Sequence, residues 1–462
     1  MQRKPTALNL ALLAAIVVLA TPSTAHAYIG PGAGIALGTT LFAFFAAFFS
    51  GLAAFFLWPL RWLIRFVRGR HALAKARIKR FVVLGLDGME PTLAEKFMAE
   101  GKMPNLSRLA KEGTFKRLAT TLPPLSPVAW STFLTGCNPG KHNIFDFLTR
   151  DKHNYLPLLS SVQIAGPSRE LKIGRYRIPL GKPRVRLLRR GKPFWNILGE
   201  HGIFGDIIRV PITFPPEPFR GVLLSAMCVP DLRGSQGTFS FYTTRPEGEG
   251  EHTGGEQFRV KRDGNTIRTH LVGPENGFRR DKVIMQCPFT VTINDRTNSA
   301  DLHVNGDTYT LKPGAYSDWI DVPFKTGLGA KVRGICQFLL LSTSPEFELY
   351  VTPINLDPAK PAMPISHPMV YSTYLSKNKG KYATLGLAED TWALNAKILS
   401  DDGFLHQCTQ ADDEREKMFM DALDKVKHGL CVCVFDGTDR VQHMFWRYID
   451  KEHPAHAGPA PD

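Results

Sequence analysis

The sequence predicts an α/β fold: a doubly wound core sheet, interrupted by an antiparallel β insertion and preceded by a transmembrane helix. Three observations lead to this prediction: two short apolar runs that each end at an acidic residue, a middle stretch of alternating apolar and polar residues, and a long uncharged apolar run near the N-terminus. The expected units are a signal peptide (1–27), a transmembrane helix with a basic flank (28–80), the N-terminal part of the core (81–240), a β-rich insertion (241–355) and a return to the core (356–462).

The N-terminal residues are typical of a targeting and anchoring region. Arg3 and Lys4, a following apolar stretch and the small-residue site Ala25-His26-Ala27 indicate a signal peptide. The uncharged run of residues 35–60 is long enough to cross a bilayer, and the arginines and lysines that follow it, up to Arg80, are typical of a cytoplasmic flank. We therefore expect a membrane protein with one anchoring segment and a soluble domain that faces the cytoplasm.

The overall charge and the cysteines limit the class of partner. A net charge of +15 favours anionic partners, and the basic flank of the predicted membrane helix accounts for part of the excess. The sequence contains no motif of a nucleic-acid-binding module, so sequence-specific nucleic-acid binding is not expected. The seven cysteines are odd in number and show no disulfide spacing, which fits a reducing compartment.

The core begins with an apolar run, Phe81 to Leu86, which predicts a strand buried on both faces and ends at Asp87. Helix-like stretches follow at about 92–99 and 105–112. Ligands of doubly wound sheets bind beyond the carboxyl ends of the strands, which is where Asp87 lies. A helix-capping or turn aspartate is the alternative, and this residue alone does not decide between the two.

Ser126 lies at the predicted start of a helix, directly before Pro127. A hydroxyl in this position faces free backbone N–H groups, which attract a phosphate. The same position suits an ordinary N-cap serine, and taken alone it favours that interpretation.

A second apolar run, residues 430–435, precedes a possible metal-binding pair. Asp439 and His443 are four residues apart, so on a helix they lie on one face, one turn apart. A carboxylate and an imidazole at this separation can bind one zinc ion. The alternative is a surface Asp/His pair.

The middle of the chain predicts strands. Alternating runs lie between about residues 289 and 351, and Asn305-Gly306 between two of them is a strong hairpin signal. The basic stretch of residues 162–191 is interpreted as a solvated loop, with contact to anionic lipid as the less favoured alternative.

Together these segments resemble the type I phosphodiesterase/nucleotide pyrophosphatase branch of the alkaline phosphatase superfamily, in a bacterial membrane-anchored subgroup. The resemblance runs from about Phe81 to the end of the chain, except for the β insertion. The segments that carry it are Val83–Gly88, Met103–Leu106, Ser126–Gly136, Pro139–His142 and Thr438–His443.

The resemblance implies an alkaline-phosphatase-like core and a two-metal hydrolase, usually with zinc. It makes Ser126 the nucleophile and also a metal contact, Asp87 a ligand of the same metal, and Asp439 and His443 ligands of the other. The implied substrate is a phosphodiester or phosphoanhydride, such as a nucleotide or a lipid headgroup. The implied class is therefore a phosphoric ester hydrolase held at a membrane.

Two departures from the family pattern qualify this expectation. Phe147 stands where many members have a phosphate-contacting asparagine, and Asn143 is the candidate substitute. The family also has an Asp-His-Gly pair and a later histidine beyond the Asp439 motif, whereas this sequence stops at Asp462. We expect a C-terminal truncation that removes the last metal ligands. The alternative function is a non-catalytic, membrane-anchored binding protein with a degenerate phosphatase-like core.

Overall fold

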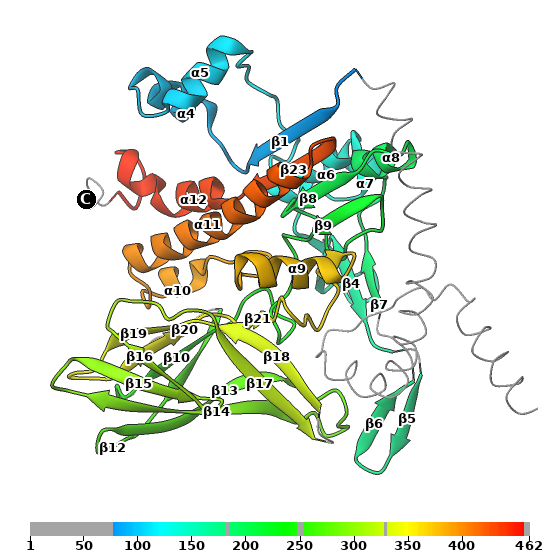
Figure 1. Cartoon of the computed structure of the whole chain (residues 1–462). Helices are drawn as coiled ribbons and strands as arrows, with labels where there is room; N and C mark the ends of the chain where they lie inside the picture. Colours follow the sequence, from blue (N-terminus) through cyan, green and yellow to red (C-terminus); the bar gives the residue numbers. More distant parts are fainter. Residues whose placement is uncertain (1–76, 168, 181–183, 247–253, 328–329, 457–462) are drawn as a thin grey trace, which may run out of the picture.

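The computed structural model describes residues 77–167, 169–180, 184–246, 254–327 and 330–456 (Figure 1). The predicted signal peptide, the apolar run and most of its basic flank lie outside these residues. Within the described part of the chain, no helix is both long and apolar enough to cross a membrane. Membrane anchoring and orientation therefore remain predictions.

The core is a five-stranded sheet with helices on both faces, as Figure 1 shows. Strand order is β1-β23-β8-β9-β22; β22 is antiparallel to β9, and the other neighbours are parallel. The bounds are β1 (Arg80–Leu86), β23 (Gly429–Phe435), β8 (Gly205–Ile208), β9 (Gly221–Leu224) and β22 (Ser366–His367). The mixed α/β class predicted from the sequence is confirmed.

Alternation along the strands explains the two helical layers. Ile207 of β8 packs with Leu134 of α6 (Ser126–Thr135) and Trp195 of α8 (Phe194–Glu200). The next residue, Ile208, points to the other face and packs with side chains of α9 (Val370–Lys379) and α11 (Asp401–Lys425). The sheet is thus covered on both sides.

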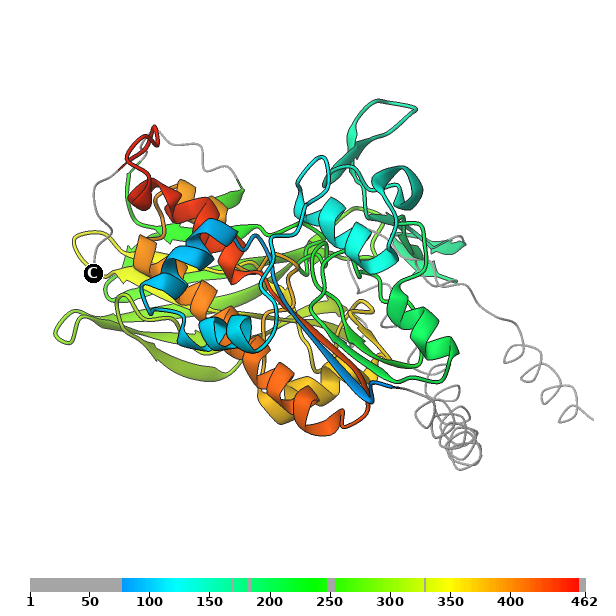
Figure 2. The same cartoon turned by 90° about the horizontal axis from the view of Figure 1, so that it is seen from above.

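Five further helices complete the described part of the core region. They are α4 (Pro91–Ala99), α5 (Pro104–Glu112), α7 (Pro139–His142) and α12 (Gly437–Ile449), and a short α10 (Thr391–Asn395) precedes α11. The two helices expected after Asp87 are confirmed, and α5 ends at Gly113 as its sequence indicates. Figures 1 and 2 both place α4 and α5 over α12, beyond the carboxyl end of β1.

The β-rich region packs three sheets around one apolar cluster. Asn305 and Gly306 both have positive φ and join β15 to β16, which confirms the hairpin. The pairing of β10 with β11 is parallel, so the region is not purely antiparallel. The strands are β10 (Phe239–Thr243), β11 (Gly255–Arg259), β12 (Arg262–Asp263), β13 (Thr266–Glu275), β14 (Ile284–Asn294), β15 (Ser299–Val304), β16 (Asp307–Leu311), β17 (Ile320–Gly327), β18 (Ala330–Cys336), β19 (Phe338–Ser342), β20 (Glu348–Val351) and β21 (Asn355–Leu356).

The interpretation of the basic stretch as a loop is wrong, because it forms strand pairs. Strand β4 pairs with β7, and β5 pairs with β6, while β2 pairs with β3 just before them. Arg177 on β6 donates to Glu275 at 2.7 Å. One of the basic residues therefore attaches the β5–β6 strand pair to the β-rich region. The bounds are β2 (Leu148–Arg150), β3 (Pro157–Leu159), β4 (Val162–Ala165), β5 (Glu170–Ile173), β6 (Tyr176–Pro179) and β7 (Arg184–Leu187).

The prediction that the first strand is buried on both faces is also wrong. Strand β1 lies at one end of the sheet, and no described strand pairs with its outer edge. Phe81, Val82 and Leu84 are 54%, 42% and 54% exposed. The apolar pattern is typical of a strand that can be buried. Among the described residues, however, a neighbouring strand lies along only one of its two edges.

Candidate active site

Asp87 is held at the carboxyl end of β1 by its main chain. Its N–H donates to the Phe435 carbonyl at 2.8 Å, and the Thr438 hydroxyl donates to the Asp87 carbonyl at 2.6 Å. The side chain caps no helix, since α4 is capped by Glu90, which accepts from the Leu93 N–H at 2.7 Å. The helix-capping alternative for Asp87 is therefore wrong, whereas its main chain does begin the turn that follows β1, and its carboxylate is buried.

Ser126 points at Asp87 and not at its own helix. Its hydroxyl donates to Asp87 Oδ1 at 3.1 Å. Helix α6 has Leu125 in the N-cap position and no side-chain cap bond. The N-cap interpretation, favoured by position alone, is wrong. Since Ser126 is the first residue of α6, the hydroxyl lies at the helix N-terminus, where an anionic group is favoured.

Trp130 is a site residue that the sequence analysis missed. Its indole N–H donates to Asp87 Oδ1 at 2.8 Å. Trp130 lies four residues after Ser126, so both side chains leave the same face of α6. This spacing is the signal that would have found it. A Cβ at Gly85 would lie 2.6 Å from the indole, so the strand has glycine where the ring approaches.

The two oxygens of Asp87 differ. Oδ1 accepts both hydrogen bonds, whereas Oδ2 is buried and has no hydrogen-bond partner within the described structure. Burial raises the pKa of Asp87, and the nearby Asp439 and Asp436 add to the rise, while the bonds from Trp130 and Ser126 oppose it. A buried, unpaired carboxylate oxygen among other acids fits a divalent cation, which would offset this repulsion.

Asp439 and His443 lie together in the first turns of α12. His443 Nε2 is 3.4 Å from Asp439 Oδ1, and the His443 side chain is 70% exposed whereas that of Asp439 is 12% exposed. Gly88 brings this pair close to Asp87: its φ is +66°, and a Cβ there would lie 2.7 Å from Asp439 Oδ1. Gln442 fixes the contact by donating to the Gly88 carbonyl at 2.7 Å. Asp87 and Asp439, 352 positions apart in the printed sequence, are thus neighbours.

Two arginines form ion pairs with the acidic residues Asp436 and Asp439. Arg415 pairs with Asp436, the residue after β23, and Arg440 Nη1 is 3.2 Å from Asp439 Oδ2. Burial works against ionisation of Asp436, yet Arg415 and its neighbouring arginines hold the pKa of Asp436 below its ordinary value. Glu389 is fully buried; burial, together with the charge of Asp436, raises its pKa to about 7. Sequence analysis missed these partners because they come from separate segments.

The Pro139–His142 motif has a structural role in this chain. His142 is fully buried, and its Nδ1 accepts from the Ile144 N–H at 3.2 Å. The proton is therefore on Nε2, which lies 3.0 Å from the Thr132 hydroxyl of α6. Burial lowers the pKa of His142, and the positive charge of Arg189 adds to the effect. The histidine locks the loop after α7 against the helix that carries Ser126.

The structure gives no support to a phosphate contact by Asn143, which stays a prediction. Asn143 ends α7 with a left-handed backbone and is exposed. Among the described hydrogen bonds, none involves its side chain. Phe147, at the position of the family asparagine, packs against the apolar cluster of the β-rich region.

Residues 81–218 match the family model described as type I phosphodiesterase / nucleotide pyrophosphatase. Over this stretch, which is less than half of the chain, the sequence is similar to that family. No curated protein and no solved structure matches the chain. The matched stretch includes Asp87, Ser126 and Trp130 and ends before Asp439. The similarity agrees with the class expected from the sequence, a hydrolase of phosphate esters.

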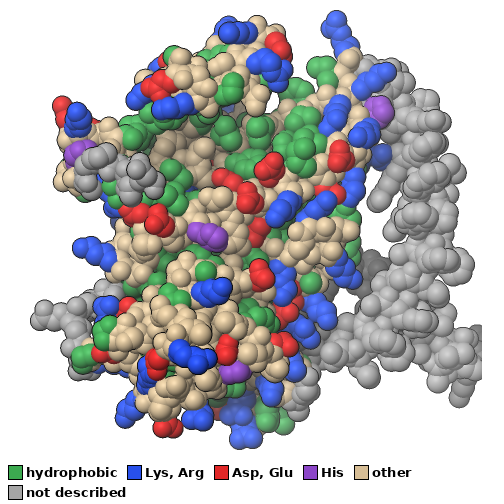
Figure 3. Space-filling view, turned by 60° about the vertical axis from the view of Figure 1, so that its left-hand side comes forward, with side chains coloured by type: hydrophobic (Ala, Val, Ile, Leu, Met, Phe, Trp, Pro, Cys, Tyr) green, Lys and Arg blue, Asp and Glu red, His purple; other side chains and the backbone are tan. Residues whose placement is uncertain are grey.

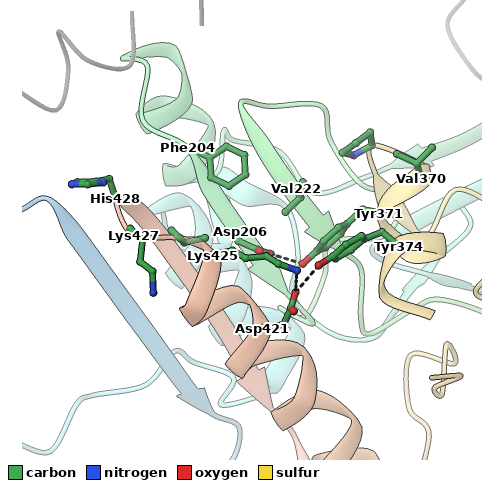
Figure 4. A pocket seen from close by; sticks show the side chains of 12 residues that line it. Phe204, Asp206, Val222, Val370, Tyr371, Tyr374, Asp421, Lys425, Lys427 and His428 are labelled. Carbon is green, nitrogen blue, oxygen red and sulfur yellow. Dashed lines mark hydrogen bonds and ion pairs between the residues drawn. The ribbon is translucent and has the colours of Figure 1, made fainter. Parts of the chain in front are cut away.

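A cavity of about 640 Å³ lies away from these residues, at the amino ends of the core strands (Figure 4). Phe204, Asp206, Tyr371 and Asp421 are among the residues that line it. It contains neither Asp87 nor Ser126. Because ligands of parallel sheets bind beyond the carboxyl ends of the strands, the Asp87 end is the better candidate for an active site. The described residues hold no cluster of three or more histidine, cysteine or acidic side chains arranged for a metal ion.

Proposed function

We propose that the chain is a metal-dependent phosphoric ester hydrolase in which the Ser126 hydroxyl attacks phosphorus. The contact between Ser126 and Asp87 carries this proposal, because it replaces the ordinary helix cap with a serine held beside a buried acid. Asp87 and Ser126 would hold one divalent ion, and Asp439 and His443 the other, with zinc expected. When bound, such ions lower the pKa of the hydroxyl and neutralise charge on the phosphoryl oxygens.

The residues of the chain perform the remaining tasks. Asp87 Oδ1 fixes the Ser126 oxygen, and Trp130 keeps that carboxylate in place through its indole N–H. The N-terminus of α6 favours the anionic phosphoryl group beside the hydroxyl. The Ser126 hydroxyl releases its proton to solvent as a bond forms between Oγ and phosphorus and the bond to the leaving oxygen breaks. The leaving oxygen takes up a proton from solvent, and water later attacks phosphorus and returns the serine to its hydroxyl form. The family supports a phosphodiester or phosphoanhydride substrate, such as a nucleotide or lipid headgroup.

The proposal is tested with Ser126→Ala and a control in the same helix. Ser131 is buried and its hydroxyl donates to the Pro127 carbonyl, away from Asp87. Zinc-dependent hydrolysis of a chromogenic phosphodiester by the full chain should fall to background in Ser126→Ala, because no nucleophile remains. Ser131→Ala should keep its turnover. Retained turnover in Ser126→Ala would show that another group attacks phosphorus.

A non-catalytic, membrane-anchored binding protein is the second candidate function. The observation that favours it is Arg440, whose guanidinium occupies one oxygen of the proposed ligand Asp439. Zinc titration by calorimetry separates the two functions. Zinc binding that weakens in both Asp87→Asn and Asp439→Asn supports the hydrolase. Zinc binding that neither substitution weakens supports the second candidate.

A further inference from the structure

The cavity at the amino ends of the core strands has apolar walls and takes no part in the proposed reaction. Its volume is about 640 Å³, and Phe204, Val222 and Val370 are among its lining side chains, all of which belong to the described part of the chain. Apolar side chains also gather beneath the α4–α5 lobe, as Figure 3 shows, but the cavity adds a buried carboxylate to its apolar walls. A concave apolar site with a few polar groups is typical of a small-molecule site.

Asp206 of β8 is this buried carboxylate, and it has no counter-ion in the described structure. The residue is 6% exposed, and its Oδ1 accepts a hydrogen bond from the Tyr371 hydroxyl at 2.7 Å. Among the described residues, no donor bonds to Oδ2 and no cation forms an ion pair with either oxygen. A buried charge without a partner is costly. Burial accordingly raises the pKa of Asp206 to about 7, although the Tyr371 hydrogen bond opposes the rise.

Asp421, the second acid of the cavity, has the partners that Asp206 lacks. Lys425 Nζ lies 2.7 Å from its Oδ2, and Lys379 Nζ lies 2.8 Å from its Oδ1. The same Lys425 ammonium is 4.5 Å from the ring centroid of Tyr374, an arrangement that favours a cation. Lys425 forms no ion pair with Asp206, and its charge is the smallest of the effects on the pKa of that residue. The cavity therefore already accommodates one ammonium group, at Asp421, and leaves Asp206 without one.

The remaining basic residues of the cavity lie at its rim. Lys427 and His428 line the cavity and are both exposed. Figure 4 shows their side chains extending away from Asp206. They are thus not its counter-ions, and the group that complements the interior of the cavity is a cation.

We propose that this cavity binds an organic amine, whose ammonium group pairs with Asp206 and whose apolar body lies against Phe204 and Val222. The rings of Tyr371 and Tyr374, nearly parallel with centroids 6.1 Å apart, contribute to the wall beside the ammonium. The bound cation would satisfy the second oxygen of Asp206 and favour its charged form. The cavity lies at the opposite end of the strands from Asp87, so binding does not require that the chain hydrolyse phosphate esters. Failure of this proposal and failure of the proposed function are therefore separate outcomes.

The first test compares three probes that share one apolar tail: n-hexylamine, n-hexanol and hexanoate. Each is titrated calorimetrically into the purified full chain at pH 8, which is above the pKa of Asp206, about 7, so that its carboxylate is charged. Hexylamine should bind about tenfold more tightly than hexanol, because an ammonium adds a charge-assisted hydrogen bond to a buried carboxylate. Hexanoate should bind more weakly than hexanol. Hexanol or hexanoate binding as tightly as hexylamine would overturn the proposal.

The second test uses a matched pair of variants. Asp206→Asn removes the charge in the cavity and keeps an oxygen that can accept from Tyr371. Asp424→Asn removes a charge from an exposed position of α11 that does not line the cavity. Hexylamine affinity should fall about tenfold in Asp206→Asn and stay unchanged in Asp424→Asn, with hexanol affinity unchanged in both. Thermal unfolding checks that each variant is folded. An amine affinity that neither substitution lowers, or that both lower equally, would contradict the pairing with Asp206.

The third test locates the bound amine. A hexylamine that carries a diazirine on its chain should label peptides from β9 or from the start of α9, and free hexylamine should prevent this labelling. Labelling confined to peptides that contain Asp87 or Asp439 would show that the acids of the candidate active site bind the amine instead, which would overturn the proposal.

Discussion

At Asp87, the Oδ1 oxygen accepts two hydrogen bonds, which leaves the Oδ2 oxygen available to a ligand. Trp130→Phe removes one donor and keeps most of the ring. Because the lost hydrogen bond stabilises the charged carboxylate, the pKa of Asp87 should rise further and zinc affinity should fall about tenfold. Calorimetric titration measures this effect. The matched control is Trp195→Phe, since the Trp195 indole N–H has no hydrogen-bond partner in the described structure. Equal affinities in both variants would show that Trp130 does not orient Asp87.

Asp206, in the cavity at the opposite edge of the sheet, predicts a pH-dependent stability. Burial raises the pKa of Asp206 from 3.8 to about 7, while the Tyr371 hydroxyl donates to its carboxylate at 2.7 Å (Figure 4). The folded state therefore holds a proton that the unfolded chain loses, so this group's contribution to stability is complete below about pH 4 and is lost as pH rises through 7.

Asp206→Asn should stabilise the protein at pH 8 by roughly 2–4 kcal/mol and have little effect at pH 4. The amide oxygen can still accept from Tyr371, so packing is kept. Thermal unfolding at both pH values measures the difference. A stabilisation that does not change with pH would contradict the assigned cause.

At the scale of elements, the close contact between the residues after β1 and helix α12 requires a glycine at position 88. Its positive φ alone costs an alanine about 1–2 kcal/mol, and the Cβ would also meet Asp439. Gly101 has a similar φ of +75° but nothing within 4 Å, so Gly101→Ala measures the backbone cost alone. Gly88→Ala should lower the free energy of unfolding by more than Gly101→Ala does, as urea denaturation can show. Equal losses would mean that Asp439 does not pack against Gly88.

Local patterns predicted helices α4, α5 and α6 and the hairpin, because these depend on neighbouring residues, but they did not predict α8, α9, α10 or α11. The spacing of Asp439 and His443 predicted their contact for the same reason. The orientation of Ser126 could not be predicted, since an N-cap and a site serine have the same local sequence. Only the approach of β1 brings Asp87 within hydrogen-bonding distance of the hydroxyl. The ion pairs Arg415–Asp436 and Arg440–Glu389 are likewise long-range, whereas Arg415–Asp412 and Asp439–Arg440 are local.

For the whole molecule, the parallel sheet explains why distant segments form one site. Strands β1 and β23 are neighbours and parallel, so Asp87 and Asp436 emerge at the same edge. The residues after β23 then place Asp439 and His443 on α12, above that edge. This arrangement could be predicted from two buried-strand patterns that each end in an acidic residue. The edge position of β1 could not be predicted, because the apolar pattern indicates a buried strand but does not show which strands lie beside it.

The central claim, that Ser126 is the nucleophile, is tested most directly by the covalent state of that residue. The full chain is mixed with zinc and a chromogenic phosphodiester, quenched in acid during turnover, digested and analysed by mass spectrometry. We predict a phosphoryl adduct on Ser126 that is absent without zinc. Zinc-dependent turnover in which Ser126 stays unmodified, or in which the adduct lies on another residue, would contradict the assignment.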